Sequence, residues 1–479
     1  MSLKKQALSG IFWTSLQRFS TQGISFVMSI ILARLLLPEE FGLIAMIGVF
    51  LNVGTALISS GLSQSLIRTD NPDEEDFSTV FFFNLAGSII IYLLLFFAAP
   101  LIAAFYKQDI LSMIIRLYCL TFIINAFAAI QTTRLTKIMD FKTQMKVAVP
   151  SLLIGSIVGV GMAWLGYGVW SLVWMNIAQS VASTIQLWFW AKWKPRVVFN
   201  VEKFKYHFNY GYKTTLAGLL NTVFADIYTI IIGRFFSPVQ VGFYNRADTL
   251  KQFPVNNIGV ILDKVTFPLF AAIKNDDVKL KSVYKRILQL VIFLVAPTLI
   301  LMAVLAEPLF RFLLTEKWLP AVPYFQILCF NGILYPVHSY NLNILKVKGR
   351  SDLFLKLEII KKFLIVAMVL ISFQFGIFGL LYGSVISSVI AFFINTYYTG
   401  KFLNYTSWEQ SKDIVPIIFL ALLAGAGVYA VDYMMRAMHF VDLLRLIIGS
   451  TSGLVLFICL AWLLKMKPLF ELKTIILRK

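Results

Sequence analysis

Polar side chains form a stripe along the first apolar segment of the chain. Ser15, Arg18, Gln22, Ser25 and Ser29 recur at spacings of three and four residues, which places them on one face of a helix. A guanidinium at membrane depth costs about 2.5–3.5 kcal/mol on insertion scales, so it normally faces a bundle interior, water or an anionic group. Arg18 is therefore a candidate anion-binding residue, and Gln22 is a candidate hydrogen-bonding residue beside it.

Similar polar rows recur in later apolar segments. The rows are Asn52, Thr55 and Ser59; Asn176, Gln179, Ser183 and Gln186; Thr222, Asp226 and Thr229; and Asn331, His338 and Asn341. Ordinary hydrogen bonds between packed membrane helices explain any one row, because Ser, Thr and Asn commonly make them. Several rows in both halves of the chain favour a shared, hydrated cavity.

Membrane helices must position these side chains. The chain has 479 residues, of which 59% are hydrophobic and 14% are charged, and its mean hydropathy is +0.79. Soluble domains average about 25% charged residues, and a bilayer span needs ~20 apolar residues. We predict an all-α integral membrane protein with about fourteen transmembrane helices. The predicted spans are residues 9–36, 41–66, 80–105, 110–132, 147–166, 168–191, 213–236, 241–270, 286–313, 318–345, 355–374, 377–400, 413–435 and 441–465.

The net charge of +19 would suggest nucleic-acid binding in a soluble protein, but the positive-inside rule explains it better here. Most of the 43 Lys and Arg residues fall in alternate connections and at the two ends of the chain. The densest clusters span residues 134–146, 192–213, 274–286, 346–362 and 465–479. This asymmetry predicts that both termini are cytoplasmic, requires an even number of spans and excludes nucleic acid as a partner.

Motifs for other chemistries are incomplete. Cys119, Cys329 and Cys459 lie far apart inside apolar runs, which indicates neither a disulfide nor a metal site. Residues 211–214 (GYKT) end like a phosphate-binding loop but lack the preceding Gly-x-x-x-x-Gly, so we do not expect ATP as the direct fuel. The acidic run 70–76 fits a solvated loop that favours the N-terminus of the following helix, with a metal site as the alternative.

An internal repeat divides the chain into halves. Residues 33–42 (ARLLLPEEFG) and 233–242 (GRFFSPVQVG) each join two predicted spans. The identities at one offset of 200 residues are Arg34 with Arg234, Pro38 with Pro238, and Gly42 with Gly242. Turn chemistry explains the motif itself, and its identical position in two hairpins favours duplication. The segment 193–212, rich in Lys and aromatic residues, suits a helix on the membrane surface. The predicted domains are residues 1–200, 201–405 and 406–479.

At these residues the chain resembles a known family. The basic start, the polar first helix and the 33–42 hairpin are similar to Wzx-type polysaccharide flippases, which belong to the multidrug/oligosaccharidyl-lipid/polysaccharide exporter superfamily. Residues 61–68 (GLSQSLIR) and 349–352 (GRSD) resemble its colanic-acid-exporter-like branch. The resemblance covers essentially the whole chain and rests on the order and spacing of the motifs.

The resemblance implies two six-helix lobes around a central cavity, followed by two C-terminal helices. It implies a protein of the bacterial cytoplasmic (inner) membrane that exports undecaprenyl-pyrophosphate-linked oligosaccharide by alternating access. It also implies membrane lipids and the polysaccharide assembly machinery as contacts. Nothing in the sequence requires more than a monomer. The candidate cations for the pyrophosphate are Arg18, Arg246, Lys251 and Lys264. Arg246 and Lys264 share a helix face with Asn257 between them. Arginine can donate two hydrogen bonds to two phosphate oxygens at once, whereas lysine supplies a single positive charge. The alternative is that these cations pair with Asp226, Asp248 or Asp263.

Asp226 is the candidate ion-coupling residue, because it is the one carboxylate near the middle of its predicted span. Either it takes up H⁺ or Na⁺ and couples an ion gradient to movement, or it neutralises a nearby arginine without titrating. His338 fits a hydrogen-bonded packing residue, with a proton shuttle as the alternative. We expect no cofactor beyond an H⁺ or Na⁺ gradient.

Two other functions compete with the flippase. One is a cation-coupled small-molecule or multidrug exporter of the same superfamily. The other is an enzyme, such as a membrane glycosyltransferase or polysaccharide polymerase, which would need a substantial external loop carrying catalytic groups. The first external turn holds only the acidic pair Glu39 and Glu40 and is too small for that purpose. We therefore expect a transporter and no catalytic residue.

Overall fold

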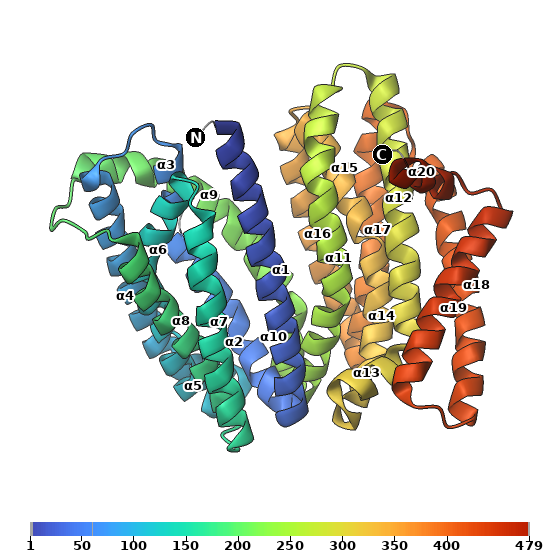
Figure 1. Ribbon diagram of the computed structural model, residues 1–479, viewed down its shortest axis with the longest axis horizontal. Coiled ribbons are helices and arrows are strands. Elements are labelled where there is room, and N and C mark those ends of the chain that lie inside the picture. Colours follow the sequence, from blue (N-terminus) through green and yellow to red (C-terminus); the bar gives the residue numbers. More distant parts are fainter. Residues whose placement is uncertain (1–2, 60, 478–479) are drawn as a thin grey trace. The chain divides into compact units, whose positions relative to one another are not determined.

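The computed structural model describes residues 3–59 and 61–477, and within these ranges the regular structure is entirely helical. Contacts divide the chain into two compact units, Met1–Gly242 and Phe243–Lys479. The helices that begin in the first unit are α1 (Leu3–Leu35), α2 (Pro38–Ser59), α3 (Leu62–Arg68), α4 (Glu74–Tyr106), α5 (Ile110–Tyr118), α6 (Leu120–Lys137), α7 (Phe141–Trp164), α8 (Val169–Ala191), α9 (Val201–Ala225), α10 (Ile227–Phe235) and α11 (Pro238–Ala272). Figure 1 colours this unit from blue to green. The expected three-domain division stays a prediction.

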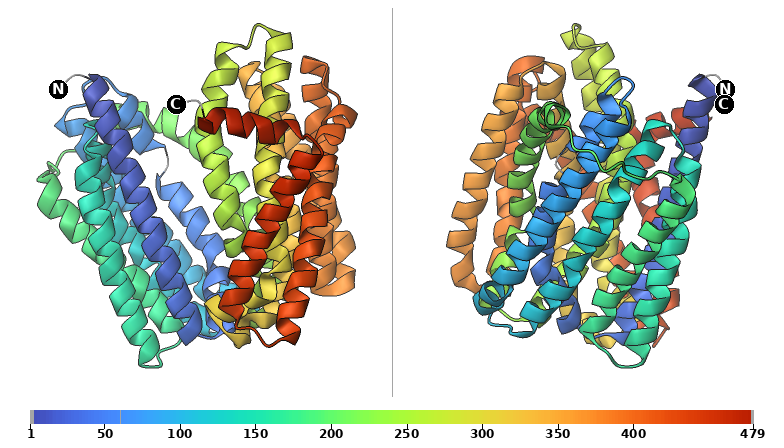
Figure 2. Two further views of the ribbon diagram at one scale, coloured as in Figure 1. Left: turned by 45° about the vertical axis from the view of Figure 1, so that its right-hand side comes forward. Right: turned by 90° about the vertical axis from the view of Figure 1, so that its left-hand side faces the viewer.

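The second unit continues from α11 to the end of the described chain. Its remaining helices are α12 (Asp277–Val304), α13 (Ala306–Leu314), the 3₁₀ turn Glu316–Ala321, α14 (Val322–Ile333), α15 (Tyr335–Val347), α16 (Ser351–Ser372), the 3₁₀ turn Phe373–Phe375, α17 (Gly376–Leu403), α18 (Ser407–Ala437), α19 (Asp442–Leu463) and α20 (Lys467–Leu477). α12 packs against α14 and α18, and α18 packs against α19. Figure 2 shows α20 lying across the direction of α19.

Polar caps define where several helices begin. The Asp73 carboxylate accepts a hydrogen bond from the Asp76 N–H, and the Asp76 carboxylate accepts one from the Asp73 N–H, which forms a capping box at the start of α4. Thr406 and Glu409 form the same box at the start of α18. The side chain of Asn200 accepts from two N–H groups at the start of α9. The expectation that the acidic run favours the N-terminus of the following helix is confirmed.

Small residues bring neighbouring helices close together in the first unit. A Cβ at Gly155 of α7 would lie 2.7 Å from the Cβ of Gln179 in α8. A Cβ at Gly159 would lie 2.8 Å from the Cβ of Met175, one turn along the same interface. Such small positions let membrane helices gain van der Waals contact without a hydrophobic driving force between them. α7 thus fits between α1 and α8.

Eight described helical segments are long and apolar enough to cross a membrane by length and composition. One of them, Ser351–Leu403, contains both α16 and α17, which pack against each other. Several predicted spans are interrupted rather than continuous. The span predicted at 110–132 divides into α5 and α6, and the one at 318–345 contains a 3₁₀ turn, α14 and α15.

The two copies of the sequence repeat build the same turn. α2 begins at Pro38, and the Leu37 N–H donates to Glu40 Oε2 at 2.6 Å. α11 begins at Pro238, and the Ser237 N–H donates to Gln240 Oε1 at 3.3 Å. Proline suits the first helical position because its missing N–H would have no partner there. The repeat in sequence is therefore also a repeat in local structure.

Candidate functional site

A polar pocket of about 400 Å³ lies in the first unit among α2 and the end of α9. Asn52 and Thr55 of α2 line it together with Thr222 and Asp226. The Asn52 Nδ2 donates a hydrogen bond to Asp226 Oδ2 at 2.9 Å. The row that contains Asn52 and the row that contains Asp226 therefore line one pocket, although they are separated by 170 residues in the chain.

Asp226 occupies a break in the helical backbone. α9 ends at Ala225, α10 begins at Ile227, and Asp226 has φ −99° and ψ 9° between them. The Asn52 amide nitrogen faces the carboxylate, and Thr55 and Thr222 line the same pocket. Carboxylate and hydroxyl oxygens suit a small hard cation, and the carboxylate can alternatively take a proton. Asn52 is the partner that the structure gives Asp226 in this pocket.

A second polar cavity, of about 260 Å³, lies within the second unit. It is lined mainly by side chains that can hydrogen-bond. They are Lys251, Gln252 and Asn256 of α11, Asn331 of α14, Tyr335 and His338 of α15, and Ser388 of α17. Lys251 was predicted as a cation for the pyrophosphate, and Asn331 and His338 as members of one polar row; the structure brings all three together. A cation among amide and hydroxyl groups can bind an anionic or polyhydroxylated ligand.

Internal contacts order the wall of this cavity. Lys251 Nζ lies 2.5 Å from Asp248 Oδ1, so the predicted alternative of pairing with Asp248 is present. His338 Nδ1 lies 3.2 Å from Asn395 Nδ2, and its Nε2 lies 3.0 Å from Ser388 Oγ. Since an amide nitrogen donates, Nδ1 accepts, and Nε2 then carries the proton of a neutral ring. Asn331 Nδ2 donates to Ser384 Oγ at 3.3 Å.

The other candidate cations lie in different surroundings. Arg18 and Gln22 are half-buried on α1. Arg246 is 6% exposed, and its guanidinium lies 5.4 Å from the centre of the Trp318 ring. The amide of Asn257 donates to the Phe253 carbonyl of its own helix at 2.9 Å. The side chain of Lys264 lies outside the part of the chain that the structure describes.

The predicted row on α8 serves helix packing. Asn176 donates to the Leu172 carbonyl at 2.8 Å, Gln179 packs against Gly155, and Gln186 Nε2 donates to Ser151 Oγ at 2.9 Å. These contacts match the alternative of ordinary helix–helix hydrogen bonding. Asn341 is buried away from the second cavity, where its Nδ2 lies 3.3 Å from Gln410 Oε1.

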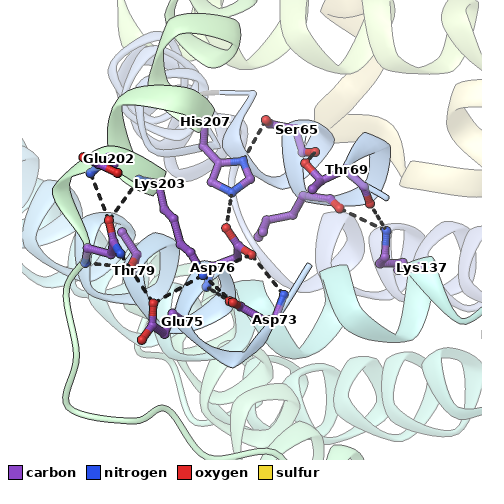
Figure 3. Close-up of polar contacts among 12 residues, drawn as sticks. Ser65, Thr69, Asp73, Glu75, Asp76, Thr79, Lys137, Glu202, Lys203 and His207 are labelled. Carbon is purple, nitrogen blue, oxygen red and sulfur yellow. Dashed lines mark hydrogen bonds and ion pairs between the residues drawn. The ribbon is translucent and has the colours of Figure 1, made fainter. Parts of the chain in front are cut away.

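Sequence reasoning missed a polar cluster that joins α9 to α3 and α4 (Figure 3). We call it the His207 cluster, made of Ser65, Asp73, Glu75, Asp76, Lys203 and His207. His207 is fully buried, with Nδ1 2.8 Å from Ser65 Oγ and Nε2 3.2 Å from Asp76 Oδ1. Lys203 Nζ pairs with Asp73 and lies 3.3 Å from Glu75 and 3.7 Å from Asp76. The sequence held one clue, an acidic run followed by a basic amphipathic segment.

Electrostatics in the His207 cluster favour its ion pairs. The hydrogen bond from Lys203, followed by that from the Asp76 N–H, lowers the pKa of Asp73 to about 2. Burial lowers the pKa of Lys203, but its hydrogen bond with Asp73 and the charge of Asp76 outweigh burial and raise it. Burial lowers the pKa of His207 below its ordinary value, and Asp76 only partly opposes this. No group of His, Cys, Asp and Glu among the described residues could hold a metal ion.

The long apolar helices are those of a multi-pass membrane protein. A family model described as polysaccharide biosynthesis protein matches residues 31–323, and the chain belongs to this family. Teichuronic acid biosynthesis protein TuaB of Bacillus subtilis (strain 168) is 27% identical over 358 residues, which cover 74% of this chain and 73% of TuaB. Lipopolysaccharide biosynthesis protein WzxC of Escherichia coli (strain K12) is 22% identical over 401 residues, which cover 82% of each chain.

Solved structures share the fold at low sequence identity. The lipid II flippase MurJ in an inward closed conformation aligns with a TM-score of 0.73 and 13% identity, covering 95% of this chain and 99% of that chain. An inward-facing multidrug resistance transporter of the MATE family and MOP superfamily aligns with a TM-score of 0.60 and 15% identity, covering 80% and 96%. The resemblance to a family of polysaccharide biosynthesis proteins is thereby confirmed, and the fold is the one that MurJ and the MATE transporter share.

Proposed function

We propose that this protein translocates undecaprenyl-pyrophosphate-linked oligosaccharide repeat units across the bacterial cytoplasmic membrane for cell-surface polysaccharide synthesis. The observation that carries the proposal is the second cavity, where Lys251 lies among amide and hydroxyl groups. A lipid-linked glycan presents phosphate oxygens next to sugar hydroxyls, and this lining offers a partner for each. The family to which the chain belongs supports the same substrate class.

The candidate residues divide into three roles in this proposal. Cations bind the pyrophosphate, namely Arg18, Arg246, Lys251 and Lys264. Hydrogen-bonding side chains receive the sugar, namely Gln22, Asn52, Asn176, Gln179, Asn257, Asn331 and His338. Asp226 takes up the coupling ion, H⁺ or Na⁺, and transport proceeds by alternating access. The contacts of Asn176 and Gln179 with α7 leave these two the weakest members of the set.

The interrupted helices support the proposed membrane arrangement. We propose fourteen crossings, with each interrupted rod counted once: two six-helix lobes, residues 1–200 and 201–405, and two C-terminal spans within 406–479. An even number of crossings and the basic connections support cytoplasmic termini. We further propose that the protein acts as a monomer, with membrane lipids around it and the polysaccharide assembly machinery as its contact.

Translocation in proteoliposomes tests the proposal. Fluorescent undecaprenyl-pyrophosphate oligosaccharides are incorporated, and their appearance on the opposite leaflet is followed with and without a pH or Na⁺ gradient. Protein-dependent, gradient-sensitive movement that a Lys251→Gln variant slows is the expected result. A folded protein that moves no member of a varied glycan panel, but does extrude cationic dyes, would overturn the proposal in favour of a multidrug exporter.

A further inference from the structure

The segment that connects α8 to the body of α9 has two different faces. Its inner face carries the buried residues Trp193 and His207. Trp193 Nε1 donates to Glu74 Oε2 at 2.6 Å, and the Arg196 N–H donates to Ser78 Oγ at 3.0 Å. The Asn200 N–H donates to Thr79 Oγ1 at 3.1 Å. Together with the His207 cluster, these bonds fix residues 193–207 to the start of α4.

The outer face of the same segment is apolar and exposed. Val197 is 94% exposed, Val201 is 54% exposed and Tyr206 is 52% exposed. Further exposed apolar side chains in this segment are Val198, Phe199, Phe208 and Tyr212. Large exposed apolar side chains on one face indicate a surface that binds a membrane or another protein. In a membrane protein such a surface lies at the lipid boundary.

Basic residues flank this apolar face. Within residues 192–212, all of which the structure describes, the exposed basic residues are Lys192, Lys194, Arg196 and Lys205. Glu202 is the one exposed acidic residue in the same range. Lysines and arginines beside exposed aromatic and branched residues are the composition of helices that lie in the headgroup layer of anionic membranes.

The position of the segment agrees with this composition. Figure 1 shows α9 beginning beside α3 at one end of the first unit, and its first turns cross the ends of the longer helices there. Val201, Lys205, Phe208 and Tyr212 recur at spacings of four, three and four residues, which places them on one helix face. His207 is buried on the other side of the same turns.

We propose that residues 192–212 form a docking surface for anionic phospholipids. Val197, Phe199 and Val201 enter the headgroup–acyl boundary, and the flanking basic side chains bind the lipid phosphates. The hydrogen bonds to α4 and the His207 cluster hold the segment rigidly against the first unit. Anionic lipids therefore bind to a segment whose position relative to α4 is fixed. This surface is separate from the two polar cavities, and its test requires no transport.

A fluorescent probe at Val197 tests the proposal. Val197→Cys is made in a Cys459→Ser background, because Cys119 and Cys329 are buried, and it is labelled with an environment-sensitive dye. The labelled protein is placed in nanodiscs, one copy each, of phosphatidylcholine alone or with phosphatidylglycerol. The expected result is a blue-shifted emission and protection from iodide when phosphatidylglycerol is present. Because each basic residue changes binding to an anionic surface by about fivefold, reversal of three charges should lower the protected fraction at least ~fivefold.

The charge-reversal variant is Lys192→Glu, Lys194→Glu and Arg196→Glu, three exposed positions. Its matched control is Lys274→Glu with Lys279→Glu, also exposed but remote in the chain, which should leave the probe protected. Thermal unfolding checks that each variant is folded. Equal protection in both lipids, or protection that survives the triple reversal, would overturn the proposal. Protection that appears only when two copies share a nanodisc would assign this face to a protein contact instead.

Discussion

Gly42 and Gly242 lie against each other's preceding proline. A Cβ on Gly42 would lie 1.8 Å from the Pro238 carbonyl oxygen, and a Cβ on Gly242 would lie 1.9 Å from that of Pro38. The two residues are equivalent positions of the internal repeat, so the contact is reciprocal. A contact in which residue i touches j and the equivalent of j touches the equivalent of i is what two-fold symmetry between the two turns produces. The repeat found in the sequence thus has a direct structural counterpart.

Alanine at Gly42 should prevent normal folding. Its methyl group would overlap a backbone oxygen, which cannot move aside as a flexible side chain can, so the cost should exceed the about 1–3 kcal/mol typical of overpacking. Gly242→Ala should have the same effect because the contact is reciprocal. Folded yield in detergent, measured by size-exclusion chromatography and thermal unfolding, checks this. Gly48→Ala is the control, since nothing lies within 4 Å of its added Cβ. Equal yields for Gly42→Ala and Gly48→Ala would contradict the assigned contact.

Asp226→Asn should separate transport from the ion gradient. The carboxylate accepts a hydrogen bond from Asn52 in a polar pocket, and in the proposed mechanism it takes up the coupling ion there. An amide cannot titrate, so export should lose its dependence on the pH or Na⁺ gradient while the protein remains folded. Initial rates in proteoliposomes with imposed gradients provide the measurement. Thr222→Val changes the same pocket without removing the charge and serves as the control. An unchanged gradient dependence in Asp226→Asn would leave the residue a structural counter-charge.

Arg18→Ala should slow export without preventing membrane insertion. A hydrogen bond to a charged group contributes about 1.5–3 kcal/mol, which corresponds to about ten- to hundredfold in rate. Arg18→Lys keeps the charge but loses paired contacts, so its rate should fall between those of wild type and Arg18→Ala. Arg116→Ala is a matched control, because this guanidinium lies over the Phe96 ring at 4.5 Å. Export rates at equal protein abundance decide the matter, and a wild-type rate for Arg18→Ala would remove this residue from the substrate path.

The sequence predicted local features better than contacts between distant segments. The helical class, the turn at Pro38 and the cap at Asp73 depend on neighbouring residues, and all three are present. The pairing of Asn52 with Asp226 depends on how α2 packs beside α9, which periodicity alone does not determine. The same limitation applies to His207, whose partner Asp76 lies 131 residues earlier in the chain. The polar rows in the sequence showed which side of each helix is polar. They did not show whether that side lines a cavity or packs against another helix.

Acidification should loosen the His207 cluster. Because burial lowers the pKa of folded His207 below the value of about 6.5 in an unfolded chain, the unfolded chain binds more protons as the pH falls. The stability that His207 contributes is therefore present above pH ~6.5 and is lost as the pH falls toward the lowered pKa. The Asp73 pKa of about 2 places its titration below this window, and Lys203 titrates above it. The carboxylates of Asp76 and Glu75 face the same cluster.

Thermal unfolding measured at several pH values checks this behaviour. Wild-type protein should lose stability between about pH 7.5 and 5.5, and His207→Gln should show a smaller loss because glutamine does not titrate in this range. His439→Gln is the control, since His439 is exposed between α18 and α19. A pH dependence that is identical in wild type and His207→Gln would show that this histidine does not titrate on unfolding.

Removal of Arg445 should strongly destabilise the second unit. Its guanidinium is 2% exposed and donates to both carboxylate oxygens of Asp432, at 2.9 and 2.8 Å, and to Asp442 at 2.9 Å. Arg445→Ala would leave the largely buried Asp432 without its partner, and breaking a buried pair costs about 3–5 kcal/mol. Asp442 retains Arg311 at 3.5 Å, so Arg445→Leu combined with Asp432→Leu should cost much less than Arg445→Ala. Arg436→Ala removes an ion pair with Glu307 whose arginine is 60% exposed, and it should cost at most about 1 kcal/mol. Unfolding temperatures in one detergent compare the three variants, and equal losses for Arg445→Ala and Arg436→Ala would refute a structural role for the buried pair.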